Sequence, residues 1–175
     1  MSAPEPRHDL DFSLMREQVA ADAAAYADTH TTPRSDDERA VAEETLRTAA
    51  VPQMMGGAVE ARLLEALAVA TRARAVLEIG TFTGTTTVAL AHAVGPGGHV
   101  TTIEFDPELA ATAQRNIDTS QVANRIDLIV GDAREVLGRL DGPFELVFID
   151  AWKQHYVRLL RIRAPASGRP RADRR

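Results

Sequence analysis

Residues 75–84 read AVLEIGTFTG, and this stretch decides the fold. A short run rich in β-branched and apolar residues is typical of a buried strand, and Gly80 closes that run. Gly80 allows a tight backbone turn, and Gly84 opens a helical pattern whose free N–H groups can face an anion. The stretch therefore predicts a strand, a glycine turn and a helix. Taken alone, the motif is equally compatible with an ordinary strand-to-helix turn that binds nothing.

Strand and helix patterns alternate after this motif. The expected strands are 75–79, 100–104, 126–130 and 144–149, and the expected helices are 84–94, 107–120 and 133–140. Parallel strands need crossover connections, so this alternation predicts βαβ units on a parallel sheet. The apolar last strand is expected to lie at an exposed edge of the sheet.

The chain before the motif is expected to be helical, and its end is expected to lie outside the fold. The expected helices are 11–28, 35–50 and 58–70, the last with Val59, Leu63, Leu64 and Leu67 on one side. Residues 158–175 hold seven of the twenty basic residues and one acid, a composition typical of a disordered tail. We therefore divide the chain into an N-terminal helical segment (1–57), a ligand-binding core (58–156) and a basic tail (157–175).

Composition excludes several classes of protein. The 175 residues contain no cysteine, which excludes disulfides and thiolate metal sites. No apolar run is long enough to span a bilayer and residues 1–10 lack a signal-peptide pattern, so we expect a cytoplasmic protein without a membrane partner. The net charge is −5, and residues 1–157 carry 13 basic against 24 acidic side chains, which argues against a nucleic-acid partner.

Carboxylates follow the expected strands. Glu104 ends the second strand, where it can accept hydrogen bonds from both hydroxyls of a ribose. Asp106, before Pro107, fits the alternative role of an acid at a helix N-terminus. Asp132 follows the third strand and either caps the next helix or reaches an adenine edge.

The fourth strand is followed by a stretch that carries several chemical groups. Residues 149–156 read IDAWKQHY, and Asp150 is expected at the same sheet edge as Gly80 and Glu104. Lys153 is the only lysine of the chain, and a lysine with a lowered pKa can act as a general base. A solvent-exposed turn without a function is the alternative interpretation.

The four motifs EIGTFTG, TIEFDP, GDAREVL and FIDAWKQHY, in this order, resemble the cation-dependent O-methyltransferases of the catechol and caffeoyl-CoA type. The resemblance covers about residues 36–156. It implies an α/β fold with the Rossmann-like sheet of class I methyltransferases, incomplete at its C-terminal end, and S-adenosylmethionine as the cofactor. It also implies a divalent cation such as Mg²⁺, although the Asp-Asn pair that supplies two further metal ligands in the family is missing from this sequence.

The resemblance also implies a role for each matching position. Gly80 and Phe82 would lie beside the methionine part of the cofactor, Thr86 would bind its carboxylate, and Glu104 would hold the ribose. Phe105 and Trp152 would flank the adenine, Ala133 and Arg134 would lie at its edge, and Met55 would approach from the N-terminal side. Glu78 and Asp132 belong to the same cofactor-binding set. Asp150 would be a metal ligand and Lys153 the base that deprotonates the acceptor.

Three functions remain open. The first is an S-adenosylmethionine-dependent O-methyltransferase that acts on a small catechol-like hydroxyl acceptor, with a homodimer as one arrangement. The second is a truncated, non-catalytic remnant that binds the cofactor or nothing. The third is an NAD-dependent oxidoreductase, against which the absence of a GxGxxG motif argues.

Overall fold

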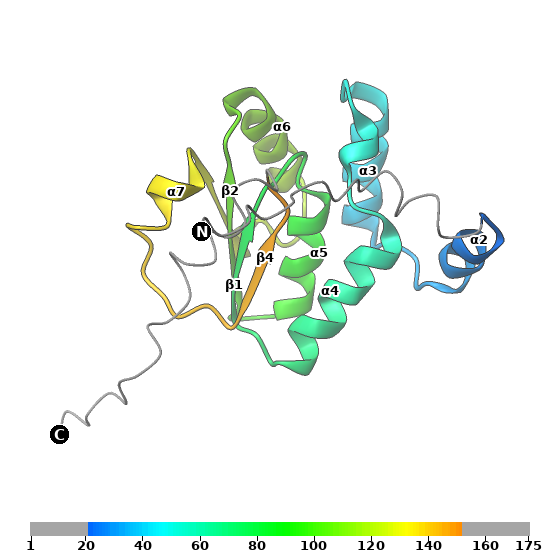
Figure 1. The fold of residues 1–175 in the computed structure, drawn as a ribbon, viewed down its shortest axis with the longest axis horizontal. Helices are drawn as coiled ribbons and strands as arrows, with labels where there is room; N and C mark the ends of the chain where they lie inside the picture. The colour runs from blue at the N-terminus through cyan, green and yellow to red at the C-terminus, as the bar shows by residue number, and fades with distance from the viewer. Residues whose placement is uncertain (1–20, 152–175) are drawn as a thin grey trace, which may run out of the picture. The chain divides into compact units, whose positions relative to one another are not determined.

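The computed structural model describes residues 21–151, and its centre is a sheet of four parallel strands in the order β3-β2-β1-β4 (Figure 1). The strands are β1 (Ala75–Ile79), β2 (His99–Glu104), β3 (Ile126–Val130) and β4 (Leu146–Ile149). All four expected strands are confirmed, with β2 starting one residue earlier and β4 two residues later than the pattern indicated. As expected, β4 lies at an edge of the described sheet.

Helices connect the strands and precede them. They are α3 (Asp36–Thr48), α4 (Ala58–Ala70), α5 (Thr85–Val94), α6 (Pro107–Asp118) and α7 (Ala133–Val136), with 3₁₀ turns η1 (Pro52–Met54) and η2 (Ala123–Arg125). The α7 helix is shorter than expected because its C-cap is Leu137 and Gly138, a poor helix former, follows. None of the helices in residues 21–151 is long and apolar enough to cross a membrane.

The helix α2 (Ala21–His30) lies in a separate unit, which ends at Thr32. The second unit begins at Pro33 and contains α3, η1 and the sheet, and the expected boundary at residue 57 stays a prediction. Within this unit α3 begins with the capping box expected at Ser35, whose hydroxyl accepts from the backbone N–H of Glu38. The expected segment 157–175 and residues 11–20 of the first expected helix lie outside the described residues.

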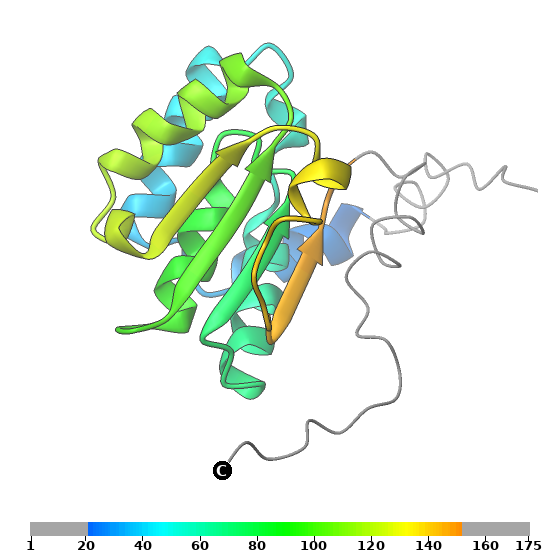
Figure 2. The same cartoon turned by 90° about the vertical axis from the view of Figure 1, so that its left-hand side faces the viewer.

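The sheet of the second unit lies between two unequal layers. Helices α4, α5 and α6 cover one face and the short α7 covers the other (Figures 1 and 2). Alternate strand residues point into the two layers, with Val76 and Val100 in the larger apolar cluster and Leu77 and Ile103 in the smaller.

The expectation that Val59, Leu63, Leu64 and Leu67 form the packed side of α4 is wrong for three of these residues. Leu64 is buried, but Val59, Leu63 and Leu67 are exposed. The buried side of the helix is completed by Ala61 and Ala68. Small alanine side chains allow α4 to approach its neighbour α5 closely, so residue size and not hydrophobicity alone decides which face is inside.

The row of residues beyond the last paired positions determines where the site lies. Ile79 of β1 pairs with Ile103 of β2 and with Ile149 of β4, so Gly80, Glu104 and Asp150 follow in the next row. Gly80 has φ +103°, and a methyl group built on it would lie 2.3 Å from the backbone oxygen of Asp150. Only glycine therefore allows β1 to turn beside the end of β4.

Replacing Gly80 with alanine is expected to lower the free energy of unfolding by about 1–3 kcal/mol, because the added carbon collides with backbone and the φ value is strained. Urea unfolding followed by circular dichroism measures the change. Gly57→Ala is the control, because Gly57 has φ −70° and a methyl group built on it would have no atom within 4 Å. Equal free energies of unfolding for Gly80→Ala and Gly57→Ala would contradict the close approach of Gly80 to the backbone of Asp150.

Candidate ligand pocket at the strand ends

An open pocket of about 270 Å³ lies at the carboxyl ends of β1 and β4. Its wall is formed by residues 54–56, the glycine turn 80–83, residues 85 and 86 at the start of α5, Phe148 and Asp150. This is the sheet edge at which open parallel α/β sheets bind ligands. The pocket thus brings together five of the residues expected at a site: Met55, Gly80, Phe82, Thr86 and Asp150.

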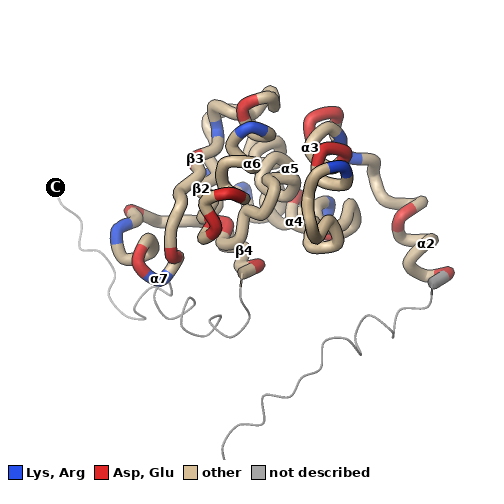
Figure 3. The backbone as a smooth tube through the Cα atoms, turned by 90° about the horizontal axis from the view of Figure 1, so that it is seen from above, with Lys and Arg blue, Asp and Glu red and all other residues tan. Residues whose placement is uncertain are grey.

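Glu104 lies behind the glycine turn and is held by backbone groups. Its Oε2 accepts from the backbone N–H of Phe82 at 2.8 Å, and its Oε1 accepts from that of Asp106 at 3.0 Å. Each carboxylate oxygen can accept a further hydrogen bond. Viewed from above, acidic positions lie at the near ends of β2 and β4 (Figure 3). The end of the sheet therefore has negative charge beside the turn.

Side chains of α3 and α6 hold the glycine turn in place by hydrogen bonds. Phe82 has φ +53°, a left-handed conformation that is uncommon for a residue with a side chain. The carbonyl of Thr83 accepts from the side-chain amide of Asn116 at 2.9 Å, and the hydroxyl of Thr83 accepts from that of Thr45 at 2.8 Å. Helices α6 and α3 thus hold the turn in a conformation that it would not adopt by itself.

The N-terminus of α5 opens onto the pocket without a side-chain cap. Its N-cap is Gly84, so no side chain accepts from the first backbone N–H groups. Thr85 is 3% exposed and lines the pocket, yet among the described residues its buried hydroxyl has no hydrogen-bond partner. Free N–H groups, a helix dipole and an unpaired hydroxyl together favour a negatively charged ligand group such as a carboxylate.

Glu78, expected among the cofactor-binding residues, is not one of the residues that line the pocket, and its part in cofactor binding stays a prediction. It is fully buried, and its Oε2 accepts from the hydroxyls of Thr87 and of Thr102, the second at 2.7 Å. The hydroxyls of Thr102 and Thr81 are 2.6 Å apart, so this network reaches the pocket wall through Thr81. Glu78 therefore supports the turn from inside the core, through hydrogen bonds that end at the pocket wall.

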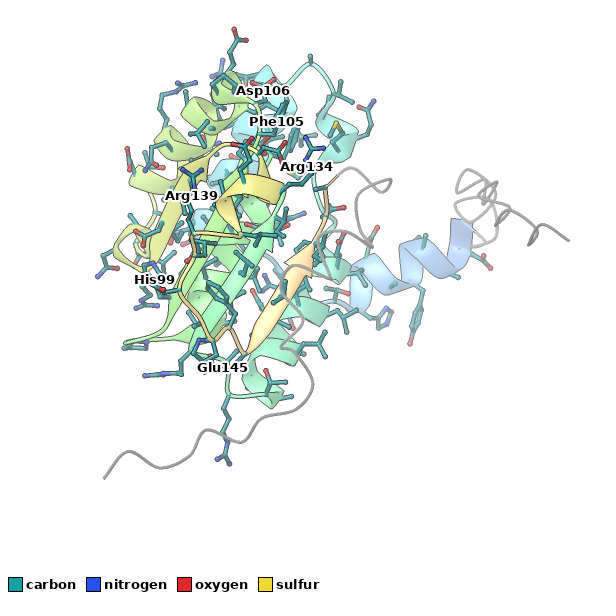
Figure 4. All side chains as sticks on the ribbon, turned by 60° about the vertical axis from the view of Figure 1, so that its left-hand side comes forward. His99, Phe105, Asp106, Arg134, Arg139 and Glu145 are labelled. Carbon is teal, nitrogen blue, oxygen red and sulfur yellow. The ribbon has the colours of Figure 1, made fainter. Side chains whose placement is uncertain are left out.

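The residues expected around an adenine lie beside the pocket and not in its wall. Phe105 and Arg134 lie at the end of the sheet opposite to His99 and Glu145 (Figure 4). Phe105 is 73% exposed, which leaves its ring available to a ligand. Asp132 accepts from the backbone N–H of Arg134 at 2.8 Å and forms an ion pair with its guanidinium, so the capping role expected for Asp132 is confirmed.

The remaining expected residues differ in where the structure places them. Ala133 begins α7 and packs against the smaller apolar cluster. Asp106 is the N-cap of α6 and accepts from the backbone N–H groups of Glu108 and Leu109, which confirms that alternative. Trp152 and Lys153 lie outside the described residues.

Sequence reasoning did not assign a site role to six residues of the pocket wall, which are Met54, Gly56, Thr81, Thr83, Thr85 and Phe148. Thr85 was detectable as the first residue of a helix after a glycine, where a hydroxyl faces the same direction as the free N–H groups. Phe148 was detectable from the alternation within β4, which places it on the same side as Leu146. Gly56 gave no signal, because only the fold places its loop against α5.

The described part of the pocket does not fit a divalent metal ion. Asp150 is its one acidic wall residue, and no group of three His, Cys, Asp or Glu side chains suited to a metal occurs in residues 21–151. Mg²⁺ requires near-octahedral oxygen coordination, and a single carboxylate supplies little of it.

Two solved structures with a similar fold are O-methyltransferases. An O-methyltransferase from Bacillus cereus in complex with SAH has 28% sequence identity and a TM-score of 0.71, covering 81% of this chain and 67% of that one. The O-methyltransferase TomG from Streptomyces achromogenes, in complex with SAM, has 30% identity and a TM-score of 0.70, covering 81% and 66%. The fold and the pocket at its strand ends thus define a protein of the Rossmann-like methyltransferase class, as expected.

Sequence comparison specifies the family. A family model described as O-methyltransferase matches residues 32–163, and the chain belongs to that family. The catechol O-methyltransferase of Mycobacterium tuberculosis is 40% identical over 137 residues, which are 78% of this chain and 62% of the relative. That of Niastella koreensis is 34% identical over 126 residues, 70% and 57% of the two chains. This chain therefore spans about three fifths of the length of these curated relatives.

The stability of the fold is expected to depend on pH through Glu78. Burial, against the lowering effect of the two threonine hydrogen bonds and with a smaller contribution from the charges of Asp150 and Glu104, raises the pKa of Glu78 from 4.5 to about 7. The folded state therefore binds the proton more tightly than the unfolded state does. The contribution of Glu78 to the free energy of unfolding is fully present below about pH 4.5. About 3 kcal/mol of this contribution is lost as the pH rises through 7.

Urea unfolding of the wild type and of Glu78→Gln between pH 4.5 and 8 measures this contribution. The difference between the two proteins isolates Glu78 from Glu65, whose pKa is also raised to about 7, chiefly by burial. Parallel stability curves of the two proteins over this range would show that Glu78 does not take up a proton on folding.

Proposed function

We propose that the chain binds S-adenosylmethionine in this pocket and is an O-methyltransferase for a small, catechol-like hydroxyl acceptor. The observation that carries the proposal is the row of Gly80, Glu104 and Asp150 beside the open N-terminus of α5, in a member of the O-methyltransferase family. The relatives named catechol O-methyltransferase support the acceptor class, and the neighbours solved with SAM and SAH support the cofactor.

The groups of the pocket suit the two ends of this cofactor. The hydroxyl of Thr85, that of Thr86 and the free N–H groups of α5 would bind the carboxylate of the methionine part. Glu104 would use its remaining lone pairs for the ribose hydroxyls, because its bonds to Phe82 and Asp106 already hold it in place. The exposed ring of Phe105 would stack on the adenine.

When bound, the cofactor supplies an electrophilic methyl group on a sulfonium centre. The contribution of the chain to the reaction is to hold that group and the acceptor hydroxyl close together and aligned, which supplies much of the rate in such transfers. Asp150 lies in the pocket wall, and its role as a metal ligand stays a prediction. The roles of Lys153 as the base and of Trp152 at the adenine stay predictions as well, as do a homodimer and a cytoplasmic location.

A non-catalytic protein that binds the cofactor is the second candidate, favoured by the metal donors that the described pocket lacks. It shares the cofactor site with the first candidate and differs from it in turnover. Binding and activity must therefore be measured separately.

Cofactor binding is tested by calorimetric titration of the 175-residue chain with S-adenosylmethionine and with SAH. Glu104→Gln is expected to weaken binding at least tenfold, because the amide replaces one acceptor oxygen and removes the charge (roughly 1.4 kcal/mol or more). Glu43→Gln is the matched control, since Glu43 is exposed on α3 away from the pocket wall. Absence of binding by the folded wild type would reject the cofactor assignment.

Activity is tested by methyl transfer to a panel of catechols, with Mg²⁺ and with EDTA. An active enzyme is expected to lose turnover in Lys153→Ala and equally in Lys153→Arg, because arginine keeps the charge but cannot accept a proton at working pH. Cofactor affinity should change little in both variants. Binding without turnover by the wild type would instead support the non-catalytic candidate.

A further inference from the structure

Glu60, in the first turn of α4, lies beside the pocket but does not form part of its wall. A methyl group built on Gly56 of the pocket wall would lie 2.9 Å from the hydroxyl of Thr86 and 3.5 Å from Oε2 of Glu60. The Glu60 carboxylate and the Thr86 hydroxyl therefore flank the same small loop. A carboxylate is thus placed next to the start of α5, where the pocket favours a negative ligand group.

The carboxylates around the pocket repel one another. The pKa of Glu60 is raised by partial desolvation and by the negative charge of Asp150, while the backbone N–H of Gly57 lowers it. The described wall residues include no lysine, arginine or histidine, and the guanidinium of Arg34, which donates to the carbonyl of Gly56 at 2.8 Å, leaves the pKa of Glu60 raised. A cationic group of a ligand between Glu60 and Asp150 would relieve this repulsion.

An unpaired group in the same corner points to a ligand. The buried hydroxyl of Thr85 has no partner in the described part of the chain, and it lies at the free N-terminus of α5. The corner thus presents donors for an anion on one side and the Glu60 carboxylate for a cation on the other. An α-amino acid carries both charges on one carbon atom.

We infer that Glu60 is a specificity-determining residue that binds the α-ammonium group of the amino-acid end of the cofactor. The inference rests on the proposed function and adds to it a reason for selecting ligands with an intact amino-acid end. A local structural role is the competing explanation, because Glu60 is at the third position of α4 and its carboxylate accepts from the backbone N–H of the N-cap Gly57.

Glu60→Gln separates the two roles, because glutamine also accepts from the N-cap N–H but carries no charge. Three probes are titrated in EDTA: SAH, an SAH analogue with hydrogen in place of the ammonium group, and 5′-methylthioadenosine, which lacks the amino-acid end. We expect Glu60→Gln to weaken SAH binding about three- to tenfold and to leave the other two affinities unchanged. Glu43→Gln, with the same loss of charge on α3, should change none of them.

The outcomes distinguish this inference from the proposed function. If Glu60→Gln weakens the binding of all three probes equally, Glu60 has a structural role. If its SAH binding is unchanged or tighter, Glu60 does not contact the ligand. Either result overturns the inference. If the wild type binds SAH in these cases, the proposed cofactor stands. If the wild type binds neither SAH nor 5′-methylthioadenosine, both the proposed function and this inference fail.

Discussion

The alignment of three parallel strands at one level is the constraint on which the rest of the structure depends. Pairing of Ile79 with Ile103 and with Ile149 places Gly80, Glu104 and Asp150 in one row, although they are far apart in the sequence. A shift of one residue in either pairing would reverse which side chains face the helices and would separate these groups. The apolar layers above and below the sheet hold the register, so the geometry of the pocket is set by the burial of residues that do not touch it.

The close approach of Gly80 to the backbone of Asp150 explains why polar groups are buried beneath the glycine turn. Gly80, which lies against the backbone of Asp150, has no side chain to fill the space below the turn. Glu78, Thr87, Thr102 and Thr81 fill that space with linked hydrogen bonds and tie β1, β2 and α5 together. Within the described residues Oε1 of Glu78 is buried without a hydrogen-bond partner, so the network stabilises the turn through Oε2 alone.

Much of the fold could be predicted because its signals are local. The strands 75–79 and 126–130, the helix 58–70 and the capping box at Ser35 follow from residue patterns within a few positions. The buried face of α4 could not be predicted in this way, because Leu63 looks more suited to a core than Ala61 until the distance to α5 is known. The row of Gly80, Glu104 and Asp150 followed from the rule for parallel sheets. The second role of Glu104, as an acceptor for the turn, depends on a φ angle at Phe82 that no residue pattern specifies.

Charge is the last property that connects the fold to a ligand. The start of α5 attracts an anion through its dipole and its free N–H groups, whereas Glu104, Asp150 and Glu60 lie around it as carboxylates. A simple anion would be attracted by the start of the helix and repelled by the acids. A simple cation would be repelled by the helix and attracted by the acids. A ligand with a carboxylate, an ammonium and a sulfonium centre satisfies both parts of the pocket at once. The mixed charge pattern is therefore a stronger reason to assign a sulfonium amino-acid cofactor than the glycine turn, which many nucleotide-binding sheets share.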